Sequence, residues 1–249
     1  MIKFAVIPAR YAATRFPGKL MQVLGSKTVI RHVYENTVAT GLFDAVWVVT
    51  DSDIILEEIQ KYGGLAVKSK KDHESGSDRI AEAIENMIVD IIVNVQGDEP
   101  FVEKKTLKSL LDVFEKDAEN QVQVASLMHA IKNQEEIDNP NNVKVVTDHN
   151  DTALYFSRSA IPFNRTTNSE VTYYKHIGVY AFRKQALLNF TSWPPGRLES
   201  IEKLEQLRYL ENEVSLKMVI THNSSIGIDT AEDLEKAKEY LREMEILKP

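Results

Sequence analysis

The sequence contains no cysteine among its 249 residues. This absence excludes a thiol nucleophile, a disulfide framework and any zinc site with thiolate ligands. The six histidines are scattered without HExxH spacing, so the sequence gives no support for a histidine-bound metal. Any chemistry of this chain must therefore use oxygen and nitrogen groups, and carboxylates are the candidates for holding a hard cation.

Long apolar runs and a positive net charge are also missing. No stretch approaches the roughly 20 apolar residues needed to span a bilayer, and the first nine residues lack the long apolar segment of a secretion signal. Lys and Arg number 30 against 37 Asp and Glu, a formal charge of −7, whereas a general nucleic-acid surface needs a basic domain or stripe. We therefore expect a cytoplasmic protein that binds neither membrane nor nucleic acid.

The first half alternates apolar runs with helical spacing, and the chain is long enough for one large α/β domain or two smaller ones. Ala45–Thr50 is rich in β-branched residues, as suits a strand buried on both faces. Strands are predicted at Ile2–Ile7, Ala45–Thr50, Leu65–Val67 and Ile91–Val95, and helices at Val29–Val38, after the caps Asp51 and Ser52, and at Asp78–Met87. This order predicts βαβ crossovers and a mostly parallel sheet.

The second half is less regular and predicts an antiparallel or mixed insertion. The Asn139–Asn142 turn and a polar stretch at 164–172 interrupt its strands. Strands are predicted at Val122–His129, Val143–Val146, Ala153–Phe156, Ile177–Phe182 and Leu216–Ile220, and helices at Leu198–Leu210 and from Ala231 onward. No Pro/Gly/Ser linker is long enough to separate independent domains.

A basic loop follows the first predicted strand, running from Pro8 to Lys19. Ligands of open α/β sheets bind beyond the carboxyl ends of the strands, where this loop must lie. The cations Arg10, Arg15 and Lys19, with Gly18 allowing close approach of the backbone, suit a polyphosphate, although neither Walker A nor GxGxxG fits. A solvated basic loop is an equally good interpretation of these residues alone.

Two aspartates are candidate ligands of Mg²⁺, which needs one or two carboxylates and fills its other positions with phosphate oxygens and water. Asp98 follows the predicted strand that ends at Val95, and Asp229 precedes the last helix. Gly97–Pro100 could equally be a simple turn. Thr230 and Asp233 are spaced as an N-cap, which leaves Asp229 available for the site.

Polar side chains also lie beside apolar elements in the second half. They include Arg158, His176 and Gln206. From residue type alone, a lone His or Gln in such a place is more often a satisfied structural group than a ligand contact.

Taken together and in order, the motifs of the whole chain resemble the CMP-Kdo synthetases. The matching segments are Ile7–Tyr11, Arg15–Lys19, His73–Arg79, Asn94–Pro100, Asn139–Asn141 with Val143–Val146, Leu154–Arg158, His176–Tyr180, Trp193–Pro195, Leu204–Arg208 and Asp229–Leu234. Each motif is weak alone, whereas ten in order are highly specific.

The resemblance implies an α/β chain with one Rossmann-like nucleotidyltransferase domain, a mostly parallel, mixed sheet and a homodimer. Residues 1–120 and 200–249 would form the nucleotide and metal core, and 121–199 the sugar-binding and dimerisation region. The implied reaction joins CTP and 3-deoxy-manno-octulosonate (Kdo) to give CMP-Kdo and pyrophosphate for lipopolysaccharide assembly. The 2-hydroxyl of Kdo would attack the α-phosphorus in line.

The resemblance also implies roles for individual residues. Lys19, Arg10, Arg15 and Asp98 would act in catalysis, and Asp98 and Asp229 would hold one or two Mg²⁺ ions. The expected nucleotide-binding residues are Pro8, Ala9, Arg10, Arg15, Lys19, Ser75, Gly76, Arg79 and Gln96. The expected sugar-binding residues are Gln96, Arg158, His176, Tyr180, Glu205 and Gln206, with Arg158 as partner of the sugar carboxylate.

Some alternatives stay open at this point. The chain departs from the commoner family pattern at Ser77-Asp78, Ala231 and Phe163, and some relatives activate 8-amino-Kdo. Sialic-acid activation with CTP is the nearest rival reaction. The loop at Pro17–Lys19 argues against a glycosyltransferase, and a non-catalytic nucleotide-sugar sensor would have little reason to keep both Lys19 and the two acids.

Overall fold

The computed structural model describes residues 1–249 except 13–15, 74, 132, 166–170, 223–226 and 247–249. The chain folds into two compact units. The first unit comprises residues 1–107 and 225–249, and the second comprises residues 108–224. The expected single domain, with divisions after 120 and 199, stays a prediction. No helix in the described part of the chain is long and apolar enough to cross a membrane.

The first unit contains a parallel sheet made from the apolar runs of the first half. Its strands follow the order β6-β1-β4-β5, and each neighbouring pair is parallel. The strands are β1 (Lys3–Ala9), β4 (Ala45–Thr50), β5 (Leu65–Lys68) and β6 (Ile91–Asn94). Every residue of β6 is buried, as a strand covered on both faces requires. The four predicted strands are confirmed.

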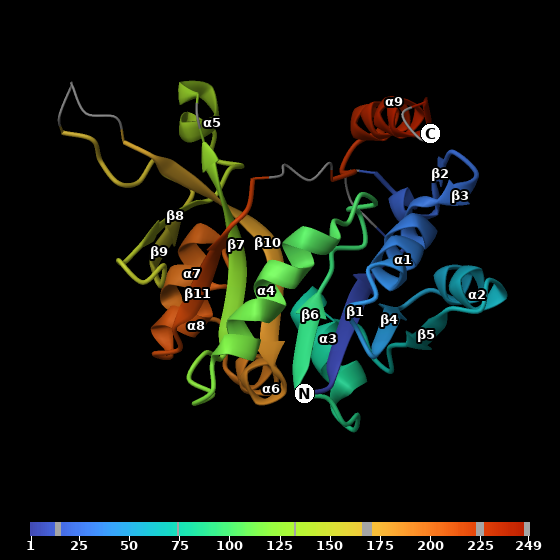
Figure 1. Cartoon of the computed structure of the whole chain (residues 1–249), viewed down its shortest axis with the longest axis horizontal. Coiled ribbons are helices and arrows are strands. Elements are labelled where there is room, and N and C mark those ends of the chain that lie inside the picture. Colours follow the sequence, from blue (N-terminus) through green and yellow to red (C-terminus); the bar gives the residue numbers. More distant parts are fainter. Residues whose placement is uncertain (13–15, 74, 132, 166–170, 223–226, 247–249) are drawn as a thin grey trace. The chain divides into compact units, whose positions relative to one another are not determined.

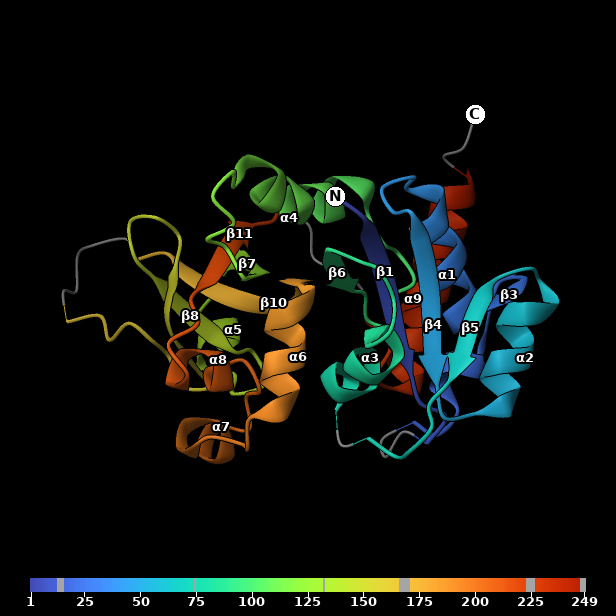
Figure 2. The same cartoon turned by 90° about the horizontal axis from the view of Figure 1, so that it is seen from below.

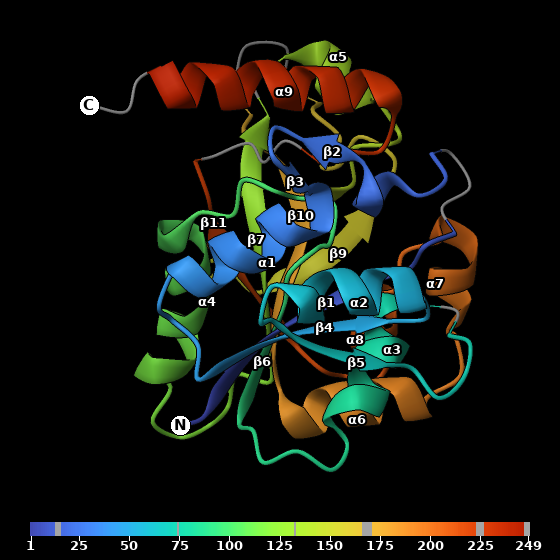
Figure 3. The ribbon, with the colours of Figure 1, turned by 90° about the vertical axis from the view of Figure 1, so that its right-hand side faces the viewer.

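Helices cover both faces of this sheet (Figure 3). α1 and α2 pack on one face, where they also contact each other, and α3 packs on the other face against β1 and β4. The helices of the first unit are α1 (Val29–Ala39), α2 (Asp53–Lys61), α3 (Gly76–Ile84) and α9 (Ala231–Ile246), with a hairpin of β2 (Val23–Leu24) and β3 (Lys27–Thr28). α9 contacts β2.

The strand order of the first unit creates a topological switch point between β1 and β6. From β1 the chain moves outward to β4 and β5, and then returns to place β6 on the other side of β1. At such a switch point the connections leave the carboxyl ends of neighbouring strands, and this is the edge at which open α/β sheets bind ligands. The basic loop after β1 and the segment around Asp98 both begin at this edge.

The second unit is built around antiparallel strands (Figure 1). β10 pairs antiparallel with β7 and with β8, β8 pairs antiparallel with β9, and β11 adds to β7 in parallel. The strands are β7 (Val124–Ile131), β8 (Lys144–Thr147), β9 (Ala153–Ser157), β10 (Tyr173–Arg183) and β11 (Leu216–Ile220). The predicted antiparallel or mixed character of the second half is confirmed, and β10 is longer than expected.

Five helices have residues in the described part of the second unit. α4 spans the residue at which the first unit ends, α6 lies along β10, and α7 packs against α8 (Figure 2). They are α4 (Lys104–Lys116), α5 (Gln134–Asp138), α6 (Lys184–Ser192), α7 (Arg197–Glu202) and α8 (Leu207–Glu211). The helices α4, α5 and α6 were not predicted from the sequence.

The predicted continuous helix at Leu198–Leu210 is wrong. Lys203 adopts a left-handed conformation with φ of 56°, which ends α7 because an L-residue cannot continue a right-handed helix from there. The break lets Arg208 turn back on α7, where its Nε and Nη2 donate to the Glu199 carboxylate at 2.7 and 2.5 Å. This buried bidentate pair stabilises the arrangement of two separate helices. Sequence periodicity could not reveal the pair.

Candidate active site

Lys19, Asp98 and Asp229 meet in the first unit. The Lys19 ammonium donates to Asp98 Oδ2 at 2.5 Å and to Asp229 Oδ1 at 2.9 Å. Their side chains are 14%, 27% and 46% exposed, respectively, so the cluster is open to solvent on the Asp229 side. Lys19 follows Gly18, which has φ of 67°, and begins a short 3-10 helix. The predicted convergence of two sequence-distant aspartates near the basic loop is present.

Lys19 and the two aspartates form a cluster with a net negative charge among these three side chains. Burial acts against the charge of Lys19, but the charges of Asp98 and Asp229 and the hydrogen bonds to them outweigh it and raise the pKa of Lys19 above its ordinary value. One ammonium beside two carboxylates leaves one negative charge. In the described part of the chain no group of three or more His, Asp or Glu side chains is placed so that it could hold a metal ion. Two carboxylates completed by phosphate oxygens and water match the requirements of Mg²⁺.

Backbone contacts hold the two aspartates in place. The Ile228 N–H donates to the backbone carbonyl of Asp98 at 2.9 Å. The Asp233 N–H donates to Thr230 Oγ1 at 3.2 Å, and the Asp233 carboxylate accepts from the N–H groups of Asp229 and Thr230. The predicted N-cap of the last helix is confirmed, and it anchors Asp229 at the helix entrance.

The predicted nucleotide-binding segments approach each other closely around Pro8. A Cβ added to Gly97 would lie 3.0 Å from the Pro8 carbonyl oxygen, and one added to Gly76 would lie 3.2 Å from Pro8 Cγ. Ser75 caps α3 by accepting from the Asp78 N–H at 3.1 Å. Gly97 was not among the predicted site residues. Its position directly before Asp98 was the feature of the sequence that could have indicated a role in the site.

A chain of hydrogen bonds links the basic loop to α3. Arg79 is buried and donates through Nη1 to Ser69 Oγ at 3.0 Å and through Nη2 to Asp51 Oδ2 at 3.2 Å. Asp51 Oδ1 accepts from the Tyr11 N–H at 3.2 Å, and the Tyr11 carbonyl accepts from the Gly18 N–H at 3.1 Å. The predicted cytidine-side residue Arg79 thus also supports the loop that delivers Lys19.

The remaining nucleotide-side predictions are placed as follows. Ala9 is buried at the end of β1 and Arg10 is exposed directly after it. Gln96 follows β6, and its backbone carbonyl accepts from the Glu99 N–H at 3.2 Å. Arg15 lies outside the described residues.

His176 is the centre of a second polar cluster, which lies in the second unit. Its Nε2 is 2.9 Å from Ser126 Oγ, and its Nδ1 is 3.4 Å from Gln206 Nε2. The ring contacts Phe156 and Tyr180 edge-on or tilted. Desolvation lowers the pKa of His176 to about 3, so the imidazole is neutral at pH 7.

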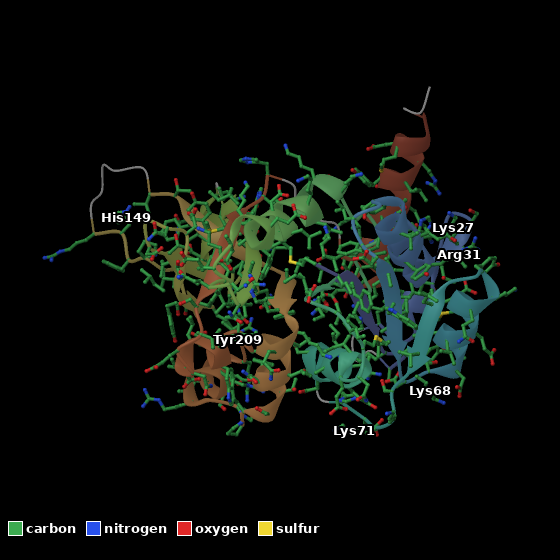
Figure 4. The ribbon with its side chains drawn as sticks, turned by 60° about the horizontal axis from the view of Figure 1, so that its bottom comes forward. Lys27, Arg31, Lys68, Lys71, His149 and Tyr209 are labelled. Carbon is green, nitrogen blue, oxygen red and sulfur yellow. The ribbon has the colours of Figure 1, made fainter. Side chains whose placement is uncertain are left out.

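Tyr180 continues this cluster into an aromatic stack. Its ring stacks on Phe182, and Tyr209 stacks on both Phe182 and Phe190; Tyr209 is labelled among the helices of the second unit in Figure 4. Desolvation, followed by the negative charge of Glu205, raises the pKa of Tyr180 well above its ordinary value. The structure therefore brings together His176, Tyr180, Glu205 and Gln206, four of the predicted sugar-binding residues.

Arg158 donates hydrogen bonds to three backbone carbonyls. Its Nε donates to the Glu202 carbonyl at 2.8 Å, its Nη1 to Pro140 at 3.1 Å and its Nη2 to Lys203 at 3.4 Å. These bonds join the Asn139–Asn142 turn to the end of α7. Arg158 therefore has a structural role here, and its predicted contact with a sugar carboxylate stays a prediction.

Lys144 completes the support of Arg158 and was not among the predicted site residues. It is fully buried, and its ammonium donates to the carbonyls of Asn139, Asn142 and Arg158 at 3.0, 2.6 and 2.5 Å. Desolvation lowers its pKa. A lysine between the valines of a predicted strand was the only signal, and it could not reveal three carbonyl partners.

Known proteins with similar sequences identify the family. Residues 4–220 match the family model of the cytidylyltransferases. The chain is 61% identical over 240 residues to a 3-deoxy-manno-octulosonate cytidylyltransferase of Flavobacterium johnsoniae, which covers 96% of this chain and 98% of that protein. This chain belongs to the 3-deoxy-manno-octulosonate cytidylyltransferase family.

Further members of the family agree with the sequence and with the fold. A 3-deoxy-manno-octulosonate cytidylyltransferase of Christiangramia forsetii is 58% identical over 237 residues, covering 95% of this chain and 96% of that protein. A solved CMP:2-keto-3-deoxy-manno-octonic acid synthetase in complex with CTP superposes with a TM-score of 0.93 at 36% identity, covering 98% of this chain and 100% of that one. The resemblance to the CMP-Kdo synthetases and the mixed α/β nucleotidyltransferase fold are confirmed.

Proposed function

We propose that this chain transfers the cytidylyl group of CTP to Kdo, giving CMP-Kdo and pyrophosphate. Membership of the 3-deoxy-manno-octulosonate cytidylyltransferase family supports the reaction. The observation that carries the proposal is the meeting of Lys19 with Asp98 and Asp229 at the edge of the sheet where ligands bind. A non-catalytic sensor would have little reason to keep this arrangement of charge.

In the proposed reaction the 2-hydroxyl of Kdo attacks the α-phosphorus of CTP. A bond forms between that oxygen and the phosphorus, the bond to the β-phosphate oxygen breaks, and the hydroxyl proton is released. Phosphoryl transfer of this kind depends on positioning and on neutralising negative charge. Lys19 and Arg10 are the cations that we propose for this role in the basic loop, with Arg15 as a third from the sequence.

Asp98 and Asp229 are the proposed holders of Mg²⁺. The pair suits an ion whose remaining ligands are phosphate oxygens and water. Such an ion supplies positive charge near the phosphates and lowers the barrier to displacement. Both carboxylates contact the same ammonium, which places them close together in the first unit.

For the sugar we propose the cluster of the second unit. The Gln206 amide, the Tyr180 hydroxyl and Glu205 offer donors and acceptors to a polyhydroxylated ligand, and the neutral His176 ring lies behind the Gln206 amide. Arg158 remains the proposed partner of the sugar carboxylate, through a guanidinium that is not fully buried.

We also propose a homodimer that works in the cytoplasm and supplies lipopolysaccharide assembly. The cytoplasm is where CTP is available. The second unit exposes Leu154, Phe163 and Ile201, which are 62%, 86% and 70% exposed and are candidates for burial between subunits. The mass in solution, measured by light scattering, tests the dimer.

A substrate panel tests the reaction. Pyrophosphate release is measured with CTP and Mg²⁺ in the presence of Kdo, 8-amino-Kdo or N-acetylneuraminate, with each other nucleoside triphosphate in place of CTP as a control. We expect release that requires both CTP and Kdo. Release with N-acetylneuraminate alone would make the chain a sialic-acid activator, and CTP binding without release in any mixture would favour a sensor.

A further inference from the structure

Ser126 occupies a position that the proposed function does not explain. It lies on β7, is fully buried, and was not among the predicted site residues. Its hydroxyl is 2.9 Å from His176 Nε2, 2.9 Å from the Val179 carbonyl and 3.2 Å from the Ile177 carbonyl. A hydroxyl has one proton to donate and two lone pairs with which to accept. Three potential partners therefore compete for that one proton.

The backbone of β10 offers two acceptors for this proton. The β7–β10 pairing slips between Ile177 and Tyr180, and a slip of this kind disrupts the regular ladder. Both nearby carbonyls belong to this slipped segment and can only accept hydrogen bonds. If Ser126 donates to Val179, its oxygen is left to accept, and His176 must then carry its proton on Nε2.

The far side of the imidazole agrees with this assignment. Gln206 presents its amide nitrogen to Nδ1 of His176 at 3.4 Å. The amide NH₂ can only donate, so the contact is favourable only when Nδ1 is unprotonated. The opposite arrangement, with the proton on Nδ1, would place two donors face to face or require the Gln206 amide to turn over.

We propose that Ser126 is a positioning residue that holds His176 in the Nε2-protonated tautomer and thereby orients the Gln206 amide with its oxygen toward the sugar. The part of this inference that concerns the sugar rests on the proposed function, whereas the part that concerns the His176 tautomer does not. The chain of donors runs from Gln206 to His176, from His176 to Ser126 and from Ser126 to the Val179 carbonyl. The result is an acceptor, rather than a donor, presented to a hydroxyl of the ligand.

The ring environment makes a neutral imidazole the relevant form. His176 is packed against Phe156 and Tyr180, and desolvation lowers its pKa to about 3. A neutral ring has one donor and one acceptor nitrogen, so the choice of tautomer sets the direction of the whole chain. A protonated ring would donate from both nitrogens and would lose the Gln206 contact.

Two variants of equal size test the effect of the hydroxyl separately from the effect of side-chain shape. Ser126→Thr keeps the hydroxyl, and Ser126→Val replaces it by a methyl group in a side chain of the same outline. Thermal melting of both variants controls for the added methyl in this buried place. The tautomer is measured by the ¹⁵N shifts of His176 in labelled protein, assigned with a His176→Asn variant.

We expect Nε2-protonated His176 in the wild type and in Ser126→Thr. Ser126→Val is expected to show Nδ1 protonation or a mixture, with KM for Kdo raised about three- to tenfold, as for one lost hydrogen bond, and KM for CTP unchanged. Wild-type protein with the proton on Nδ1 would overturn the inference. So would a Ser126→Val protein that keeps both the tautomer and KM of Ser126→Thr, or equal losses in the two variants.

The tautomer readout distinguishes this inference from the proposed function. If the wild type shows no turnover of Kdo, the proposed function fails, while the ¹⁵N shifts of the three proteins still decide the role of Ser126. If the tautomer changes in Ser126→Val but KM for Kdo does not, the orientation of Gln206 toward the sugar is refuted.

Discussion

Replacement of Asp98 by Asn tests the centre of the proposed mechanism. The substitution keeps the size of the side chain and removes one of the two carboxylates that contact Lys19. The charge of these three side chains rises from −1 to 0, so they attract a further cation less strongly. Lys19 keeps Asp229 as a partner, and the substituted side chain remains partly exposed, so the fold should be preserved.

The expected loss follows from the electrostatics of a site near the protein surface. Two unit charges about 4 Å apart interact by about 4 kcal/mol at an effective dielectric constant of about 20. At 1.36 kcal/mol for each factor of ten, this corresponds to a loss of about 10³-fold in kcat. The same order is expected when metal-based charge stabilisation is removed.

The assay is pyrophosphate release at saturating CTP and Kdo, with Mg²⁺ varied. The matched control is Asp53→Asn on α2, which removes the same charge from an exposed side chain that pairs with Lys68 in the first unit. We expect near-normal turnover for the control and equal melting temperatures for both variants. An Asp98→Asn protein that is folded and turns over within a few-fold of wild type would refute the assignment of Asp98 to the metal.

Three further predictions follow from the described contacts. Lys19→Met should lower kcat by about 10²- to 10³-fold, as for loss of one preorganised donor, while Lys19→Arg should recover part of it; equal activity of wild type and Lys19→Met in the pyrophosphate assay would exclude a role in transition-state charge. Arg158→Ala should raise KM for Kdo with KM for CTP little changed, and it should lower the melting temperature because three carbonyls lose a donor; an equal rise in both KM values would refute the sugar-side role. Burial alone would raise the pKa of Asp233, but hydrogen bonds from Thr230 and from two backbone N–H groups lower it. This carboxylate therefore contributes stability above its unfolded pKa of about 3.8, and that stability is lost as the pH falls through the lower folded value. In urea unfolding, Asp233→Asn should be less stable than wild type by roughly 1 kcal/mol at neutral pH and equally stable at the acid end. A stability difference that does not change with pH would contradict this.

Several parts of the fold followed from local pattern. The apolar, β-branched run at Ala45–Thr50 and the apolar run at Ile91–Val95 suit strands of a sheet covered on both faces, and both form strands of the first unit. The three-residue spacing of Thr230 and Asp233 indicates the helix cap that these residues form. These features depend on neighbouring residues, which is why they can be read without coordinates.

Other parts depended on partners that are distant along the chain. Periodicity at Leu198–Leu210 predicts one helix, whereas the Glu199–Arg208 pair and the left-handed Lys203 divide it into two. Lys144 is isolated in the sequence, yet three separate carbonyls surround its ammonium. Neither outcome can be inferred from residue type, because the stabilising contacts exist only after the segments have packed.

The sequence by itself determined the chemistry available to this protein: no thiol, a basic loop after the first strand, and acids placed at the ends of elements, in an order that matches one enzyme family. Only the tertiary structure decided that Asp98 and Asp229 meet at one ammonium, and that Ser126 faces His176 across the slipped pairing of β7 and β10. The physical reason is that charge and hydrogen bonding act over a few ångströms of space, while the sequence records only the order of the residues.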